Sequence, residues 1–336
     1  MSFPLNFLSV CLFVILTLLS FPSYGFVAQN TANPPSQGQL VTPKKLLDPD
    51  MVELSGRNFM TSDGVLLSGA FYPGNADKET IPIILLHGQG KSREEFAPLI
   101  EEMKKRGYAV LAFDFRGHGE STTRFSDPRE DMQPENMVQP PTPPQPPKPI
   151  QYLAKDFKRA DYENMYKFDT LPFYRFLVQQ NNAERLNLNK LVIIGVDMGG
   201  TVGGQMTKQL WANSRGKNVR SLVIVSPNYD PFSKTLLKDA KCFHKNVPLL
   251  MIVGQLDRQS KENALSLRDE ILGKEKRRDD DPTSMSSPVP IAEFPTERQG
   301  GELLKESKLG IPQKIADYIN MTLTSHSERD LRWRKM

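Results

Sequence analysis

The chain of 336 residues is poor in the side chains that form disulfides and most metal centres. It has two cysteines and four histidines. Cys11 lies in an apolar N-terminal segment that we expect to be removed, which leaves Cys242 without a partner. A lone cysteine of this kind is usually a small buried hydrophobe. No Cys/His spacing resembles a zinc site, so we expect no disulfide, no metal and no other cofactor.

The chain also lacks a marked excess of charge of either sign. Lys and Arg number 43 against 39 Asp and Glu, a formal net charge of +4. Proteins that bind nucleic acid usually carry a basic stripe or a known module, and neither is found, so we expect no nucleic-acid partner. The basic run at 332–335 predicts a frayed basic tail over residues 325–336; contact of this tail with acidic lipid is the alternative.

The first 25 residues contain no Asp, Glu, Lys or Arg. Residues 8–19 are almost wholly apolar, and Ser23 and Gly25 place small side chains at −3 and −1 of a signal-peptidase site. This apolar run is short for a membrane span of about 20 residues. We expect a signal peptide over 1–25, an exported protein (periplasmic or secreted), and a polar linker over 26–50. An uncleaved N-terminal membrane anchor is the alternative.

Strand and helix patterns alternate along the rest of the chain. Apolar runs predict strands at 81–87, 108–115, 191–196, 219–226, 247–253 and 289–294. Amphipathic or polar-flanked segments predict helices at 93–106, 199–211, 261–272 and 301–323, and a helical region that begins near 156 and ends near 177. Asp63-Gly64 predicts a hairpin that joins strands at 58–61 and 65–72. Such alternation predicts one domain over 51–324 with a mostly parallel sheet and helices on both faces.

Two insertions interrupt this pattern. Residues 134–149 hold eight of the 27 prolines, and we expect this stretch to be polyproline II or irregular and to join no sheet. It follows a strand at the ligand-binding edge of the sheet. It could therefore line the rim of a site, present a surface to a protein partner, or be a tolerated surface insertion. The polar stretch 274–288 predicts a solvated loop at the opposite edge, without a role in the site.

Glycine-rich turns follow four of the expected strands. They read His87-Gly88-Gln89-Gly90, Asp114-Phe115-Arg116-Gly117-His118-Gly119-Glu120-Ser121, Gly195-Val196-Asp197-Met198-Gly199 and Gly254-Gln255-Leu256-Asp257. In order and spacing, from about residue 57 to 323, the chain resembles the α/β-hydrolase superfamily. The resemblance implies an eight-stranded, mostly parallel sheet. Only residues 228–246 separate two of the strands where relatives insert a cap, so we expect no cap domain.

The resemblance also implies positions for a catalytic triad and an oxyanion hole. In this family a strand–turn–helix elbow carries G-x-S-x-G, and here Asp197 stands in place of the serine. Met198 and Gln89 would offer the two backbone oxyanion donors. Asp257 takes the acid position, and Gln299 stands where relatives carry the histidine.

These replacements alter the chemistry that the site can perform. A serine nucleophile needs an adjacent base, and both are missing. An aspartate can attack carbon directly, as in dehalogenases and epoxide hydrolases, which the chain resembles at this position, but a histidine must then activate water. Gln has no titrating proton. The remaining histidines predict no substitute; they are His87, His118, His244 and His326.

The sequence therefore favours a non-catalytic protein, a pseudoenzyme that either binds an unidentified small molecule or is a remnant of an enzyme. An active ester hydrolase, or a dehalogenase- or epoxide-hydrolase-like enzyme with Asp197 as nucleophile, is the alternative. At the start of a helix and among backbone N–H groups, Asp197 is expected to have a low pKa. A fixed anion there would oppose a second, developing anion, so the cavity is expected to prefer a cationic or hydrogen-bond-donating ligand.

Overall fold

The computed structural model describes residues 50–126, 148–212, 218–228, 247–273 and 281–336. The expected signal peptide, nearly all of the expected linker, residues 134–147 of the Pro-rich stretch and most of the stretch where a cap would lie are outside these ranges. Among the described residues, no helix combines the length and the apolar character that crossing a membrane requires.

An eight-stranded sheet forms the centre of the described fold, in the order β1-β3-β5-β4-β8-β9-β10-β11. Only β3 runs against its neighbours β1 and β5, and the pairs from β5 to β11 are parallel. The strands are β1 (Val52–Leu54), β3 (Gly69–Tyr72), β4 (Pro82–Leu86), β5 (Ala109–Phe113), β8 (Leu191–Val196), β9 (Val219–Val225), β10 (Leu249–Gly254) and β11 (Ile291–Phe294). The expected fold, a mostly parallel sheet with eight strands, is confirmed.

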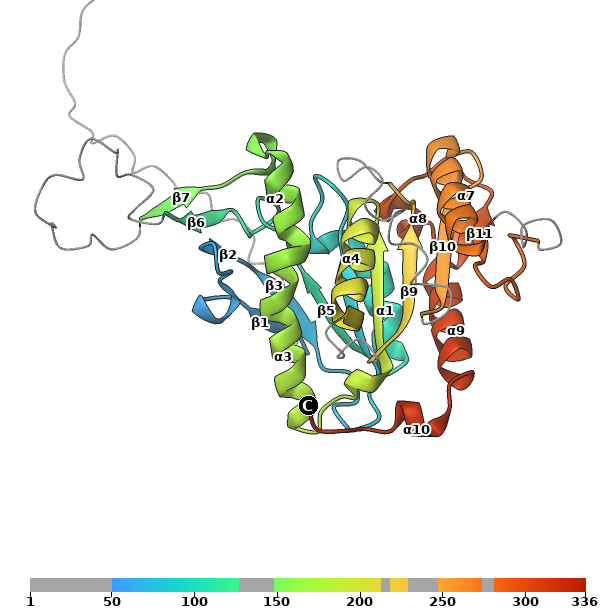
Figure 1. Cartoon of the computed structure of the whole chain (residues 1–336), viewed down its shortest axis with the longest axis horizontal. Coiled ribbons are helices and arrows are strands. Elements are labelled where there is room, and N and C mark those ends of the chain that lie inside the picture. Colours follow the sequence, from blue (N-terminus) through green and yellow to red (C-terminus); the bar gives the residue numbers. More distant parts are fainter. Residues whose placement is uncertain (1–49, 127–147, 213–217, 229–246, 274–280) are drawn as a thin grey trace, which may run out of the picture. The chain divides into compact units, whose positions relative to one another are not determined.

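Helices cover both faces of this sheet (Figure 1). One apolar cluster joins the sheet to α3 (Thr170–Asn182), α4 (Met198–Ala212) and α7 (Arg258–Leu272). A second cluster joins the other face to α1 (Ala97–Lys105), α8 (Gly301–Lys305) and α9 (Ile311–Thr324). Every residue of β4, β8 and β10 is buried, which explains why these strands read as continuous apolar runs.

The expected single helix over 301–323 is wrong. The segment forms α8, a 3-10 turn at Ser307–Leu309, and α9. Gly310 has φ = 59°, in the left-handed region, and Pro312 follows it at the start of α9. Gly310 ends the 3-10 turn, and Pro312 suits the start of α9 because proline lacks an N–H and fits best in a first helical turn.

The expected hairpin around Asp63-Gly64 is only partly present. Its first arm is a 3-10 turn, Arg57–Phe59, instead of a strand, and its second arm divides into β2 (Val65–Leu66) and β3. The hairpin pairing that remains is a bridge between Met60 and Leu66, with backbone hydrogen bonds from Thr61 to Val65 at 2.8 Å and from Leu67 to Phe59 at 3.1 Å. β2 also pairs with β6 (Thr123–Phe125) of a second, three-stranded sheet.

The third strand of that small sheet, β7 (Pro149–Gln151), corrects the expectation that the Pro-rich stretch joins no sheet. Pro149 pairs with Phe125 of β6. β7 is the edge strand of the order β2-β6-β7, where a residue without an N–H is tolerated. Ser126 and Lys148, which flank the residues outside the described ranges, are held together by a backbone hydrogen bond of 3.1 Å.

The C-terminal residues are held against the domain, so the expected frayed tail is also wrong. We call residues 328–336 the C-terminal strap; it includes α10 (Glu328–Leu331). Side chains of the domain donate to its backbone carbonyls: Asn187 to Leu331 at 2.8 Å, Asn181 to Arg334 at 2.9 Å, and Arg220 to Asp330 at 2.7 Å. The strap crosses the amino ends of the central strands (Figure 1).

Candidate functional site

Asp197 lies at the turn between β8 and α4. Its φ is 52°, a left-handed conformation that is unusual for a residue with a β-carbon. The turn is tight because a β-carbon at Gly199 would lie 2.0 Å from the Leu86 carbonyl oxygen, and one at Gly195 would lie 2.3 Å from the Gly199 oxygen. Glycine at both positions therefore lets the elbow pack against β4 and project the Asp197 side chain from the sheet edge.

The Asp197 carboxylate occupies the backbone donors that were expected to bind an oxyanion. Its Oδ2 accepts the Gln89 N–H at 3.1 Å, and the Met198 N–H and the Asn228 side chain also hydrogen-bond to this carboxylate. The pKa of Asp197 is nevertheless raised, because burial outweighs these hydrogen bonds and the Asp257 charge adds to it. The expectation of a low pKa is wrong: it counted the donors and left out desolvation.

Asp197, Asp257 and Gln299, which the resemblance assigns to triad positions, line one cavity of about 320 Å³. Asp197 and Asp257 reach it from the carboxyl ends of β8 and β10, and Gln299 from the loop between β11 and α8. The Gly300 N–H donates to Ser226 Oγ at 2.8 Å, which fixes this loop beside the elbow.

Of the two carboxylate oxygens of Asp257, one accepts a hydrogen bond and the other has no partner among the described residues. Its Oδ1 accepts the Ser260 N–H at 3.1 Å and so caps α7. Its Oδ2 is buried and has no hydrogen-bond partner among the described residues, although the side chain lines the cavity. A triad histidine would donate to such an oxygen, and Gln299 makes no such bond here.

No histidine of the described residues lines this cavity. His87 Nε2 accepts the Phe115 N–H at 2.9 Å and its Nδ1 donates to the Gly88 carbonyl at 2.8 Å, while burial lowers its pKa to about 3. His118 donates from Nδ1 to the Arg116 carbonyl at 2.8 Å. Both rings therefore serve the packing of the turns. His326 hydrogen-bonds to the Thr322 carbonyl, and His244 lies outside the described residues.

Glu95 is a site residue that the sequence analysis missed. It lies in the 3-10 turn Arg93–Phe96 and lines the same cavity, although it is only 6% exposed. Its Oε1 accepts the Gly88 N–H at 2.6 Å, and its Oε2 has no partner among the described residues. Burial, together with the nearby Asp197 charge, raises the pKa of Glu95 to about 7. Its position four residues before Leu99, on the apolar face, was the available signal.

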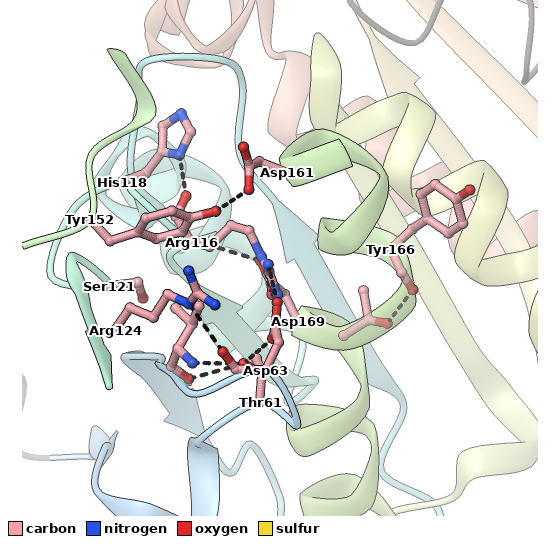
Figure 2. Close-up of polar contacts among 12 residues, drawn as sticks. Thr61, Asp63, Arg116, His118, Ser121, Arg124, Tyr152, Asp161, Tyr166 and Asp169 are labelled. Atoms are coloured by element: carbon pink, nitrogen blue, oxygen red, sulfur yellow. Dashed lines mark hydrogen bonds and ion pairs between the residues drawn. The ribbon is translucent and has the colours of Figure 1, made fainter. Parts of the chain in front are cut away.

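A buried ion-pair network fixes the turn after β5 (Figure 2). The Arg116 side chain is 1% exposed and donates from Nε to Asp169 Oδ1 at 2.8 Å and from Nη1 to Asp63 Oδ2 at 2.6 Å. The Arg116 N–H also donates to Asp169 Oδ2 at 3.0 Å. These bonds join the loop before β2, the turn and the start of α3, and the carbonyl of the same Arg116 accepts the hydrogen bond from His118.

The segment after β7 reaches the rim of the site. Tyr162 of α2 (Arg159–Asn164) accepts a hydrogen bond of 3.2 Å from Gln89 Nε2, and Gln89 is the residue whose backbone N–H binds Asp197. Tyr162 also packs edge-on against Phe157. Residues that follow the Pro-rich stretch therefore contact the site, while 127–147 lie outside the described ranges. No group of three or more potential metal ligands occurs among the described residues.

Comparison with known proteins agrees with this architecture. The family described as the alpha/beta hydrolase fold matches residues 81–265. The chain is 34% identical over 80 residues to protein YfhR of Escherichia coli strain K12, which is 23% of this chain and 28% of that protein. It is 34% identical over 82 residues to the thiohydrolase aneE of Aspergillus aculeatus, 24% of each chain. The chain thus spans about a quarter of the length of these relatives.

Solved structures resemble the fold over a longer stretch. The Pyrococcus furiosus esterase Pf2001 has a TM-score of 0.51 and 18% identity, and the match covers 81% of this chain and 90% of that one. A dienelactone hydrolase from Anabaena variabilis has a TM-score of 0.50 and 16% identity, with coverage of 81% and 98%. At this identity the likeness concerns the fold, and the chemistry has to be argued from the site.

Proposed function

The chain belongs to the alpha/beta hydrolase fold family, and we propose that it uses this fold to bind a small ligand without transferring acyl groups. One observation carries the proposal: the Gln89 N–H, an expected oxyanion donor, already donates to Asp197 Oδ2 at 3.1 Å. In place of a neutral serine hydroxyl, the elbow presents a carboxylate that fills the oxyanion hole itself.

Acyl transfer fails in this arrangement for three reasons. An oxyanion hole works when its donors lie 2.7–3.1 Å from the oxygen on which charge develops, and here a carboxylate oxygen holds them. A second anion beside Asp197 would also be repelled. Moreover, the Gln299 amide has no proton-accepting nitrogen that titrates near neutral pH, so it cannot activate a hydroxyl or a water.

The same carboxylates favour a ligand that is cationic or rich in hydrogen-bond donors. Asp197 and Asp257 face one cavity, and Asp257 Oδ2 lacks a donor. A buried acceptor without a partner costs free energy that a donor on a ligand would recover.

The test is a substrate screen of the protein without its signal peptide over acyl esters, thioesters, haloalkanes and epoxides, with calorimetry of small amines and carboxylates alongside. We expect no turnover, and tighter binding of amines than of carboxylates. Asp197→Asn keeps the shape and removes the charge, so it should weaken amine binding. Turnover that Asp197→Asn abolishes, or tighter binding of carboxylates, would overturn the proposal.

A second candidate is an enzyme in which Asp197 is the nucleophile. If Oδ1 formed an alkyl ester, Oδ2 would become the ester carbonyl oxygen, already bound by the Gln89 N–H. Charge that develops on Oδ2 during water attack at Cγ would then be stabilised. Haloalkane or epoxide turnover that depends on Asp197 would support this candidate; it still requires a base, which Gln299 cannot supply.

The elbow itself can be tested by restoring the serine. Asp197→Ser alone is expected to show no esterase activity on p-nitrophenyl acetate, because the base is still missing. Asp197→Ser combined with Gln299→His is expected to exceed the single variant by at least about 100-fold, the lower range of general-base catalysis. Robust hydrolysis by the single variant would show that another residue acts as the base.

We also propose that the protein is exported after cleavage behind Gly25, with a retained N-terminal anchor as the alternative. The uncharged, apolar first 25 residues support this. N-terminal sequencing of the exported product should give a sequence that begins at Phe26, and a product that begins at Met1 would favour the anchor.

A protein partner for the Pro-rich stretch is a further proposal, which a pull-down with and without residues 127–147 would test.

A further inference from the structure

We propose that Glu95 is a third carboxyl group of the binding site and that it holds an ammonium group of the ligand together with Asp197. This inference rests on the proposed binding function and names the ligand class as an organic amine. It adds a consequence that simple binding does not require: the ligand should displace a proton from the protein.

Glu95 and Asp197 lie on two sides of the same glycine. The Gly88 N–H donates to Glu95 Oε1 at 2.6 Å, and a β-carbon on Gly88 would be 3.2 Å from Asp197 Oδ2. On the far side of Glu95, a β-carbon at Gly301 would be 2.3 Å from Oε2. The missing side chain at Gly301 therefore makes the space for the Glu95 carboxyl group, and the missing side chain at Gly88 leaves room for Asp197.

Two oxygens in this cavity are acceptors without donors. Glu95 is 6% exposed and Asp257 is 2% exposed, and Glu95 Oε2 and Asp257 Oδ2 have no hydrogen-bond partner among the described residues. Buried polar atoms in native proteins are nearly always paired. An ammonium group offers three donors and no acceptor, which suits a cavity whose unpaired atoms are carboxyl oxygens.

The charges around Glu95 favour a cation over a neutral donor. Asp197 faces it from the elbow, Lys91 from the loop after β4, and Lys305 from α8. The positive charge of Lys305 is partly offset, because its Nζ lies 2.7 Å from Glu302 Oε1. Asp197 repels an ionised Glu95, and an ammonium ion between the two carboxylates would offset this repulsion. A neutral hydroxyl group would donate a hydrogen bond to an unpaired carboxyl oxygen but would leave the repulsion in place.

Proton release follows from this electrostatic argument. The pKa of Glu95 is raised to about 7, so about half of the molecules carry its proton at that pH. Bound ammonium stabilises the ionised form, and roughly half a proton per ligand should leave the protein at pH 7.

The experiment compares three probes of equal chain length by titration calorimetry on the protein without its signal peptide. They are 1,3-diaminopropane, uncharged 1,3-propanediol and anionic malonate, each at pH 7 in phosphate and in MOPS, two buffers without a primary ammonium group whose ionisation enthalpies differ. We expect the diamine to bind most tightly, with a buffer-dependent heat that reports about half a proton released. Glu95→Gln should abolish the release and weaken diamine binding at least about tenfold. Glu94→Gln, on the same turn but exposed, should change neither.

Each other outcome separates this inference from the proposed function. If the diamine binds equally to wild type and Glu95→Gln without proton release, the role of Glu95 is refuted and the binding function stands. If the diol binds as tightly as the diamine, the amine class is refuted. If no probe binds, both the amine inference and the proposed binding function are refuted.

A carboxyl ¹³C titration of Glu95 in the free protein gives a second readout. The midpoint of this titration should lie near pH 7 and should fall in Asp197→Asn. An unchanged midpoint would contradict the electrostatic coupling between Glu95 and Asp197.

Discussion

At the scale of single residues, the site is a group of carboxyl side chains whose surroundings differ. Asp197 has backbone donors, Asp257 caps a helix with one oxygen, and Glu95 has one backbone donor and one unpaired oxygen. Burial raises the pKa of both Asp197 and Glu95. The free-energy cost of burying these carboxyl groups close together should therefore make the unfolding free energy depend on pH.

Glu95→Gln is expected to change how stability depends on pH. The pKa of Glu95 rises from about 4.5 in the unfolded chain to about 7 in the fold, so its contribution is fully present below pH 4.5 and is lost as pH rises through 7. Between pH 5 and 8, wild type should lose about 3 kcal/mol of unfolding free energy relative to Glu95→Gln. Urea unfolding at several pH values measures this difference, and parallel curves for the two proteins would contradict it.

Residue identity predicted the triad positions better than it predicted Glu95. The family resemblance implied positions for Asp197 and Asp257 at glycine-rich turns and for Gln299 before Gly300, and the structure brings the three residues to one cavity. Glu95 precedes an amphipathic helix, where acidic residues commonly lie in the first turn and are solvated. Its place on the apolar face, four residues before Leu99, indicates burial, but the contact with Gly301, which is distant in sequence, has no local pattern.

At the scale of elements, prediction succeeded where a segment's own side chains decide its structure. The buried strand β8 has the expected bounds, and α7 ends at Leu272 as expected. Prediction failed where tertiary contacts decide: β2 pairs with β6, which is distant in sequence, and Arg57–Phe59 forms a 3-10 turn where a strand was expected. Short edge strands have few apolar residues, so their pairing is settled by tertiary contacts.

Pairing of β6 with β7 makes the Pro-rich stretch removable. Phe125 pairs with Pro149, and Ser126 bonds to Lys148, so the two ends of 127–147 already meet. Replacing these residues by a four-residue glycine-containing turn should leave the fold intact and raise the unfolding free energy by about 1 kcal/mol, because the closed loop is shorter. Calorimetric melting measures this. A loss of more than about 2 kcal/mol would mean that the stretch packs against the domain.

At the scale of the whole molecule, the two ends of the central strands differ in their surroundings. Residues that follow the carboxyl ends of β8 and β10 line the cavity, while the C-terminal strap covers the amino ends of the central strands. Arg220, 8% exposed at the start of β9, donates to both the Asn189 and the Asp330 carbonyls at 2.7 Å. The last residues of the chain thereby close the end of the domain that lies opposite the site.

Removal of residues 328–336 should therefore reduce stability without affecting the site. The loss of several side-chain-to-backbone hydrogen bonds, at about 1 kcal/mol each, predicts an unfolding free energy lower by about 2–4 kcal/mol. Diamine affinity at a temperature where the truncated protein is folded should stay unchanged. Lys335→Gln serves as the control for lost charge and should match wild type. A truncated protein as stable as wild type would show that the strap contributes nothing.

The carboxylate at the elbow also determines how this protein would behave toward covalent reagents. Fluorophosphonates identify serine hydrolases because an activated hydroxyl displaces fluoride and the phosphonyl oxygen settles among the backbone donors. Here the elbow has no hydroxyl, Asp197 already occupies the Gln89 donor, and the nearby Ser226 hydroxyl is occupied by the Gly300 N–H. An inventory of hydrolase-fold proteins based on such labelling would therefore omit this one, although its backbone has the same architecture.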